Sequence, residues 1–309
     1  MATTSPIKNT SKGDRFNSIF VEVCSKSMEF TNPNCVRIFS LDIQNNSFSY
    51  VGLHQLLQNN IGRYVFSRAA IERFYLDDET EAISAKALEL LRAANNPHDC
   101  GAGGELGEIL LYLFLEQNLN APKILSKMEL KSSENQYVYG SDGVHLLFCS
   151  DSSGKALCQL VLGESKIVGS LTSAIDDAFK SITKVIDTPD NELRLIESNI
   201  FKESFDKETA DYLKQLIIPT KRDLNMPIDK AFGIFLGYTI ELDSALFSNA
   251  EYRIALQKKM IDDITKHTSY IEAKIKKQNL NAYSFYFYIL PFDNAAKDRA
   301  DIINKLKGK

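Results

Sequence analysis

The segment GELGEILLYLFLEQN, at residues 104–118, places the strongest constraint on the fold of this 309-residue chain. As a helix, it would carry apolar residues on most of its faces. A surface helix buries only one stripe, so a helix that is apolar nearly all round has to be enclosed by other elements. We therefore expect a core helix here, packed against the other layers of the fold.

The segments that follow indicate how those layers are arranged. Three strand candidates, at 123–130, 143–149 and 156–166, come in quick succession, and the short loops between them favour antiparallel neighbours. A helix over about 171–185 and a buried strand at 231–240 come next. This order predicts an α/β (α+β) fold, in which a mixed central sheet has the core helix on one face and further helices on the other.

The rest of the chain adds a predicted extension at each end. Residues 1–95 contain two strand-like runs and three helical patterns, and an Asn-Asn-Pro-His segment breaks the last helix. We place a domain boundary there, between an N-terminal α+β accessory region that docks a partner (1–95) and the main domain (96–309). Near the C-terminus, an aromatic strand is predicted at 283–290, after an amphipathic helix at 250–277. One side of this helix is expected to comprise Ile254, Gln257, Ile261, Ile264, Thr268, Ile271 and Ile275.

Composition narrows the classes of function. The formal net charge is −4, whereas proteins that bind nucleic acid alone are usually basic. A nucleic-acid-binding role would need either a cleft that gathers the lysines and arginines or a partner that supplies affinity. The five cysteines include no CxxC pair, which indicates reduced thiols in a cytoplasmic protein and argues against a zinc site. No apolar run approaches the ~20 residues that span a bilayer, and the N-terminus has no apolar signal segment, so we expect no membrane association.

Glu164 and Lys166 give the first indication of a catalytic centre. Side chains alternate along a strand, so these two point to one face and Ser165 points to the other. An apolar strand that ends in this way brings a carboxylate and an ammonium group together. Taken alone, however, the pattern is more typical of an ordinary ion pair at the surface end of a strand.

Asp142 makes a catalytic interpretation stronger. The turn-forming residues 150–155 centre a hairpin near Ser153, and Asp142 and Glu164 are equally distant from that point. They would face each other with their Cβ atoms ~5 Å apart, unless the register slips by one residue and turns them to opposite faces. Two carboxylates that close raise each other's pKa unless a cation lies between them, and Mg²⁺ prefers such oxygen ligands. Lys166 would then stabilise negative charge developing on a phosphate or orient the attacking water.

Two glutamates at the start of the core helix are a third element of the pattern. Glu105 and Glu108 are three residues apart and therefore share a helical face. Acidic residues interact favourably with a helix N-terminus, which is one explanation for both. Beside Asp142 and Glu164, we interpret them as supplying an additional ligand to the metal or to water.

These residues together resemble the PD-(D/E)XK nuclease superfamily, which includes restriction endonucleases. The resemblance covers about 100–185, and it lacks the proline of the family's name because Ser141 precedes Asp142. It implies a restriction-endonuclease-like core at 96–309 and metal-dependent hydrolysis of phosphodiester bonds. Asp142, Glu164 and Lys166 would be catalytic, and the two acids would bind Mg²⁺, or Mn²⁺ in its place.

A closer resemblance is to the HamA family, the effector subunits of the Hachiman anti-phage defence system. The segments that carry it are GGELGEILLYLFLEQ, APKILSKMELKSSENQYVYGSDGVHL and LVLGESKIVGSLTSAIDDAF. The resemblance implies a cytoplasmic bacterial nuclease that cuts DNA and works with a superfamily 2 helicase partner, HamB. It maps the helix ligand to Glu108 or Glu105, and the apolar run after the second Gly-Glu pair favours Glu108 as the third metal ligand.

Two other functions stay open from the sequence. The chain could be a catalytically inactive PD-(D/E)XK fold that binds DNA, or an adaptor that presents its acidic cluster to a helicase. His145 is not interpreted as catalytic, because strand alternation turns it away from Asp142, and we expect it to pack or to form a hydrogen bond.

Overall fold

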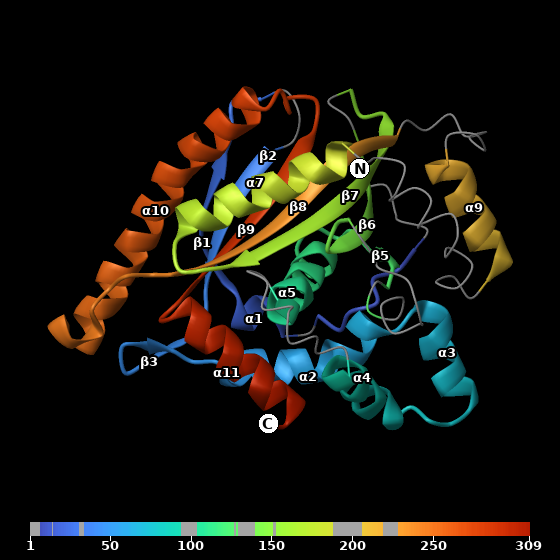
Figure 1. Cartoon of the computed structure of the whole chain (residues 1–309), viewed down its shortest axis with the longest axis horizontal. Helices are drawn as coiled ribbons and strands as arrows, with labels where there is room; N and C mark the ends of the chain where they lie inside the picture. Colours follow the sequence, from blue (N-terminus) through green and yellow to red (C-terminus); the bar gives the residue numbers. More distant parts are fainter. Residues whose placement is uncertain are drawn as a thin grey trace.

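A seven-stranded mixed sheet, in the order β1-β2-β9-β8-β7-β6-β5, forms the centre of the protein (Figure 1). The structure is a computed structural model that describes residues 7–13, 15–30, 34–93, 104–126, 128, 140–150, 153–187, 206–218 and 228–309. The strands are β1 (Val21–Ser27), β2 (Asn34–Ser40), β5 (Lys123–Leu125), β6 (Gly143–Ser150), β7 (Ala156–Ile167), β8 (Ile228–Thr239) and β9 (Ser284–Phe292). A separate two-stranded sheet pairs β3 (Ile43–Gln44) with β4 (Ser47–Phe48).

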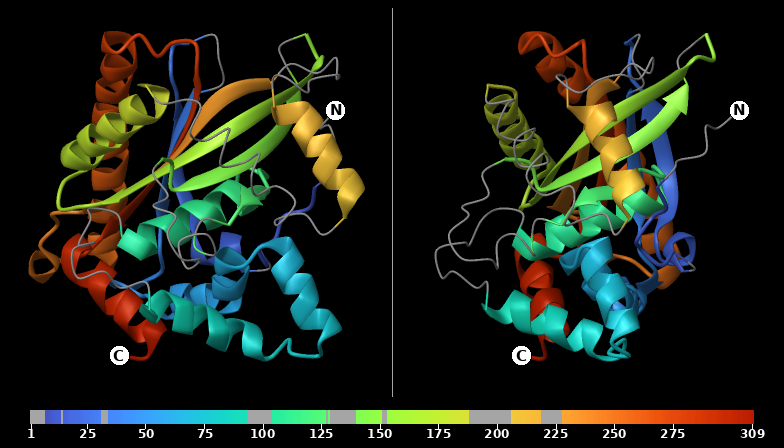
Figure 2. Two further views of the ribbon diagram at one scale, coloured as in Figure 1. Left: turned by 45° about the vertical axis from the view of Figure 1, so that its right-hand side comes forward. Right: turned by 90° about the vertical axis from the view of Figure 1, so that its right-hand side faces the viewer.

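Helices cover both faces of the central sheet. On one face lies α5 (Gly104–Gln117), and on the other lies α7 (Leu171–Asp187), as Figures 1 and 2 show. The remaining helices are α1 (Phe16–Ile19), α2 (Val51–Val65), α3 (Arg68–Leu76), α4 (Ala82–Ala93), α9 (Lys207–Ile217), α10 (Asn249–Lys277), α11 (Ala295–Lys307) and a short 3-10 helix (Ser244–Leu246). Over the described ranges, none of the helices combines the length and the apolar character needed to cross a bilayer. The predicted mixed sheet flanked by helices is confirmed.

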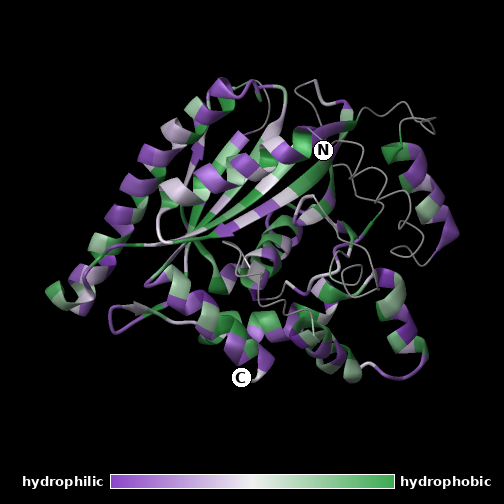
Figure 3. Cartoon of the chain, in the orientation of Figure 1, coloured by the Kyte–Doolittle hydropathy of each residue, from purple (hydrophilic) through white to green (hydrophobic). Residues whose placement is uncertain are grey.

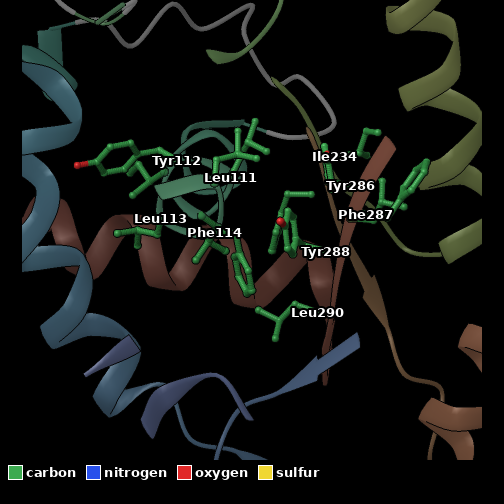
Figure 4. Packing of buried hydrophobic residues seen from close by; sticks show 14 of the residues in the cluster. Leu111, Tyr112, Leu113, Phe114, Ile234, Tyr286, Phe287, Tyr288 and Leu290 are labelled. Atoms are coloured by element: carbon green, nitrogen blue, oxygen red, sulfur yellow. The ribbon is translucent and has the colours of Figure 1, made fainter. Parts of the chain in front are cut away.

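The core helix α5 lies close against the sheet because glycines on the neighbouring strands leave room for its leucines. A Cβ atom added at Gly163 of β7 would lie 2.7 Å from Leu111, and one at Gly233 of β8 would lie 2.4 Å from Leu115. Phe114 of the same helix packs against Tyr288 of β9, with ring centroids 5.1 Å apart (Figure 4). The helix is buried continuously from Ile109 to Glu116, as its sequence predicted.

The buried side of α10 is the predicted one at Ile264, Thr268, Ile271 and Ile275 but differs in the first half of the helix. Ile254 and Ile261 are exposed, at 70% and 36% of their surface, and Gln257 is exposed as well. With 3.6 residues per turn, residues about four positions apart lie on the same side of the helix. The buried residues before Ile264 follow this spacing, and Ile254 and Ile261 lie to the side of them. Figure 3 shows the mixed hydropathy along this helix. The buried apolar residues are Tyr252, Leu256, Met260, Ile264, Ile271 and Ile275.

Residues from both sides of the predicted boundary at 95 contribute to one sheet. β2 pairs in parallel with β9, from Asn34 with Phe285 to Ile38 with Ile289, and β1 pairs antiparallel with β2 (Figure 2). The N-terminal segment 7–13 is also fixed on α5, where the buried Glu116 carboxylate accepts a hydrogen bond from the Ser11 amide at 2.6 Å. The described part of 1–95 therefore belongs to the same core, while the functional division at 95 stays a prediction.

The close approach of α5 to the sheet can be tested at Gly233. We expect Gly233→Ala to lower the free energy of unfolding by about 1–3 kcal/mol, because the added Cβ would overlap Leu115, which is fully buried and cannot swing into solvent. Urea unfolding would measure the change. The control is Gly169→Ala, since no atom lies within 4 Å of the added Cβ there. Equal losses in the two variants would contradict the packing argument.

Candidate active site

The β6–β7 hairpin has the register that the sequence predicted. Its pairs run from Ser150 with Ala156 to Gly143 with Gly163, centred on Ser153. Extending the register by one residue sets Asp142 beside Glu164, and the Asp142 amide donates to the Gly163 carbonyl at 2.7 Å. Residues 151 and 152 of the predicted turn lie outside the described residues. The hairpin therefore delivers the two acidic positions to the same end of the central sheet.

Glu164 and Lys166 form an ion pair on the face that α7 covers. The Lys166 Nζ lies 2.5 Å from Glu164 Oε1, and the two side chains are only 17% and 6% exposed. Two residues of α7 act electrostatically on this pair: the polar Ser181 side chain lowers the pKa of Glu164, and the negative charge of Asp177 raises the pKa of Lys166. The predicted sharing of one face by these residues is explained by the alternation along β7.

The Asp142 carboxylate points toward Ser165, which strand alternation places on the other face of β7. Its Oδ2 accepts hydrogen bonds from the Ser165 amide, at 2.8 Å, and from the Ser165 hydroxyl, at 2.7 Å. Ser165 in turn faces Gly107 of α5. β6 begins only at Gly143, so Asp142 precedes the strand and its side chain is not bound by the alternation. Asp142 thus lies between the Glu164 side of the sheet and the α5 side.

The two helix glutamates have different surroundings. Glu105 pairs with the buried Lys307 of α11, with Oε2 and Nζ 2.5 Å apart. Glu108 accepts a hydrogen bond from the Tyr64 hydroxyl at 2.8 Å and lines a small cavity together with Asp142. Of the two alternatives left open by the sequence, Glu108 is therefore the one beside Asp142. It lies on the α5 face of the sheet, whereas Glu164 lies on the α7 face.

Several polar residues of this cavity were not among the predicted site residues. They are Tyr64, Tyr112, Lys123 and His145. Tyr64 comes from α2, far away in the sequence, so only the tertiary fold could place it there. His145 is fully buried beside the Ala121 carbonyl, 2.8 Å from its Nδ1, and burial lowers its pKa to about 4. The hydrogen bond agrees with the role expected for His145, but the expectation that it is turned away from Asp142 is wrong, because both residues line this cavity.

The surroundings of Glu164 disfavour its ionised form. Burial and the neighbouring Asp142 carboxylate raise the pKa of Glu164 to about 8, although Lys166 and Ser181 act in the opposite direction. A divalent ion with a preference for oxygen would offset this charge, so the donor pair suits Mg²⁺ or Mn²⁺. Within the described part of the chain, no three His, Cys, Asp or Glu side chains are gathered as a metal-binding group. The charge and the oxygen donors of Asp142 and Glu164 thus suit such an ion. Glu108 does not form a three-residue cluster with them.

Comparison with known proteins places the chain in a family. The model of the HamA family matches residues 16–306, almost the entire length. The chain belongs to the HamA family. Membership of the family indicates a component of a Hachiman defence system. The match includes the hairpin, α5 and the N-terminal strands alike. No curated protein and no solved structure gives a significant match.

The raised pKa of Glu164 predicts a pH dependence of stability. The ordinary value is 4.5, so the folded state holds this proton more tightly than the unfolded state. The contribution of Glu164 to stability is fully present below about pH 4.5 and is lost as the pH rises through about 8. Glutamine cannot ionise. In EDTA, the Tm of Glu164→Gln minus that of the wild type should therefore increase between about pH 5 and 8.

A surface glutamate provides the control for this measurement. Glu251 accepts hydrogen bonds from Ser248, which lower its pKa, so it is ionised throughout the same pH range. The Tm difference for Glu251→Gln should stay constant over that range. A flat difference for Glu164→Gln as well would show that Glu164 ionises as easily in the folded protein as in the unfolded chain.

Proposed function

We propose that this chain is the nuclease subunit of a Hachiman system and hydrolyses phosphodiester bonds in DNA with the help of Mg²⁺ or Mn²⁺. The observation that carries the proposal is the buried Glu164–Lys166 pair beside Asp142 at the end of the hairpin. It is the acid, acid and lysine combination of the PD-(D/E)XK resemblance, in the predicted register. The raised pKa of Glu164 adds support, since burial and the Asp142 carboxylate both disfavour a negative charge that a cation would offset.

Each of the three residues has a role that follows from its position. Asp142 and Glu164 would hold the metal ion, with Glu108 as a further ligand from α5. When bound, the ion would act as a Lewis acid toward the scissile phosphate. Lys166 would place its ammonium group, oriented by Glu164, where negative charge develops on the phosphate. The small exposed fractions of Glu164 and Lys166 would strengthen these charge interactions by limiting access of water.

A helicase partner would complete this function. A chain with a net charge of −4 has little long-range attraction for DNA. A superfamily 2 helicase, HamB in the resemblance, would supply contacts to the phosphates and bring the nuclease to its substrate. The helicase would also keep the nuclease inactive until the complex binds DNA. We propose that cleavage takes place in the cytoplasm, in a complex of both subunits.

One observation favours a second function. Glu164 and Lys166 partly neutralise each other, and Glu108 lies across the sheet from them, so the described residues do not form a cluster of three acids. This arrangement would suit a catalytically inactive subunit that binds DNA or serves as an adaptor for the helicase. In that case, substitution of Lys166 would weaken assembly of the complex and remove no nuclease activity.

Cleavage of plasmid DNA by the purified complex, with helicase and ATP, tests the proposal. EDTA should stop cleavage, and Asp142→Asn and Lys166→Met should each lower the rate by about 10²–10³-fold, as is usual for loss of one preorganised charge at a transition state. Binding of the helicase should survive. Cleavage that continues in EDTA, or at the wild-type rate in Lys166→Met, would overturn the proposed mechanism, and absence of cleavage by the wild-type complex would support the adaptor.

The matched control is Lys297→Met, which removes a lysine from an exposed ion pair with Asp301 on α11. It should leave the cleavage rate unchanged. Lys166 is far more buried, and its removal leaves the Glu164 carboxyl without its cation, so some loss of stability is expected. Circular dichroism at the assay temperature would establish that each variant is folded before rates are compared.

A further inference from the structure

Ser165, the residue between Glu164 and Lys166, is held in a tight space between β7 and α5. Its side chain is 1% exposed. Opposite it, α5 has a glycine, and a Cβ atom at Gly107 would lie 2.9 Å from the Ser165 Oγ and 3.1 Å from the Ser165 Cβ. The hydroxyl group therefore has little freedom to turn toward solvent or toward the helix. Its position is fixed by packing.

Both hydrogen bonds from Ser165 reach the same oxygen of Asp142. The amide and the hydroxyl donate to Oδ2 at 2.8 and 2.7 Å. In the part of the chain that the structure describes, Oδ1 accepts no hydrogen bond. Asp142 precedes β6, so the ladder restrains its backbone only through its amide, which donates to the Gly163 carbonyl. The direction of its carboxylate depends on Ser165.

We infer that Ser165 is a positioning residue, which, with Gly107 behind it, directs Oδ1 of Asp142 toward a divalent cation. The inference rests on the proposed function, because it concerns the same metal ligand. It explains why the residue between the two family positions is a small, hydroxyl-bearing one. It also explains why α5 carries Gly107 at the point of closest approach, since any larger residue there would displace Ser165. Such hydrogen bonds to a ligand contribute to metal affinity without touching the ion.

Calorimetric titration of the full-length protein with Mn²⁺, in the absence of DNA, measures the affinity for the ion and tests this role. Ser165→Ala should weaken Mn²⁺ binding by about 10-fold, at the lower end of the range for partners of metal ligands, because the amide hydrogen bond remains. Gly107→Ala should have a similar effect by pushing the hydroxyl out of place. Asp142→Ala should remove the binding. In cleavage assays, Ser165→Ala should raise the Mn²⁺ concentration for half-maximal rate and leave the rate at saturating Mn²⁺ nearly unchanged.

Ser284→Ala is the matched control. Ser284 is another buried serine of the sheet, and its hydroxyl accepts a hydrogen bond from Gln159 at 3.0 Å, away from Asp142. Its loss should leave Mn²⁺ affinity unchanged. Equal weakening in Ser284→Ala and Ser165→Ala would assign the effect to general destabilisation and overturn the inference. If Gly107→Ala does not fold, Ser165→Ala decides alone.

The remaining outcomes separate this inference from the proposed function. Wild-type Mn²⁺ affinity in Ser165→Ala, together with lost binding in Asp142→Ala, would overturn the role of Ser165 and leave the nuclease proposal standing. Absence of both Mn²⁺ binding and metal-dependent cleavage in the wild-type protein would instead overturn the nuclease proposal, and this inference with it.

Discussion

The close contact between α5 and the sheet is the constraint on which the candidate site depends. Gly163 and Gly233 have no side chain on the strands, which leaves room for Leu111 and Leu115 of the helix. Gly107 has no side chain on the helix, which leaves room for Ser165 of β7. Close packing of this kind excludes voids and fixes neighbouring rotamers. The same contact places Glu108 at the cavity beside Asp142. If the helix lay further from the sheet, the positions of Ser165 and Glu108 would not be restrained.

The opposite face of the sheet contributes the charged pair. α7 covers Glu164 and Lys166, so both ions are largely removed from water. Burial of an ion pair is weak support for stability, because desolvation of the two charges offsets much of their attraction. The role that we propose for the pair is therefore catalytic and not stabilising. Asp142 connects the two faces, since it lies at the end of the strand next to Glu164 and is bonded to the residue that faces α5.

Much of this arrangement could be predicted from local sequence. The apolar character of α5, the turn at Ser153 and the alternation along β7 each depend on short stretches of chain, and each led to the observed element or register. Contacts between distant segments could not be predicted in this way. The bond from Tyr64 to Glu108 and the pairing of Glu105 with Lys307 depend on how α2 and α11 pack. The direction of the Asp142 side chain depends on where β6 begins.

The pairing of β2 with β9 has a consequence for how the protein is made. β2 leaves the ribosome about 250 residues before its neighbour β9, and β8 lies between β9 and the hairpin in the sheet. The hairpin is local and can form early, but the side of β7 that pairs with β8 stays open until residues 228–239 have been synthesised. Long-range pairing of this kind is slow and occurs late in folding. A chain interrupted before residue 228 would therefore carry Asp142, Glu164 and Lys166 without the strands that pair beside β7, and the candidate site would be assembled only after β8 has been made.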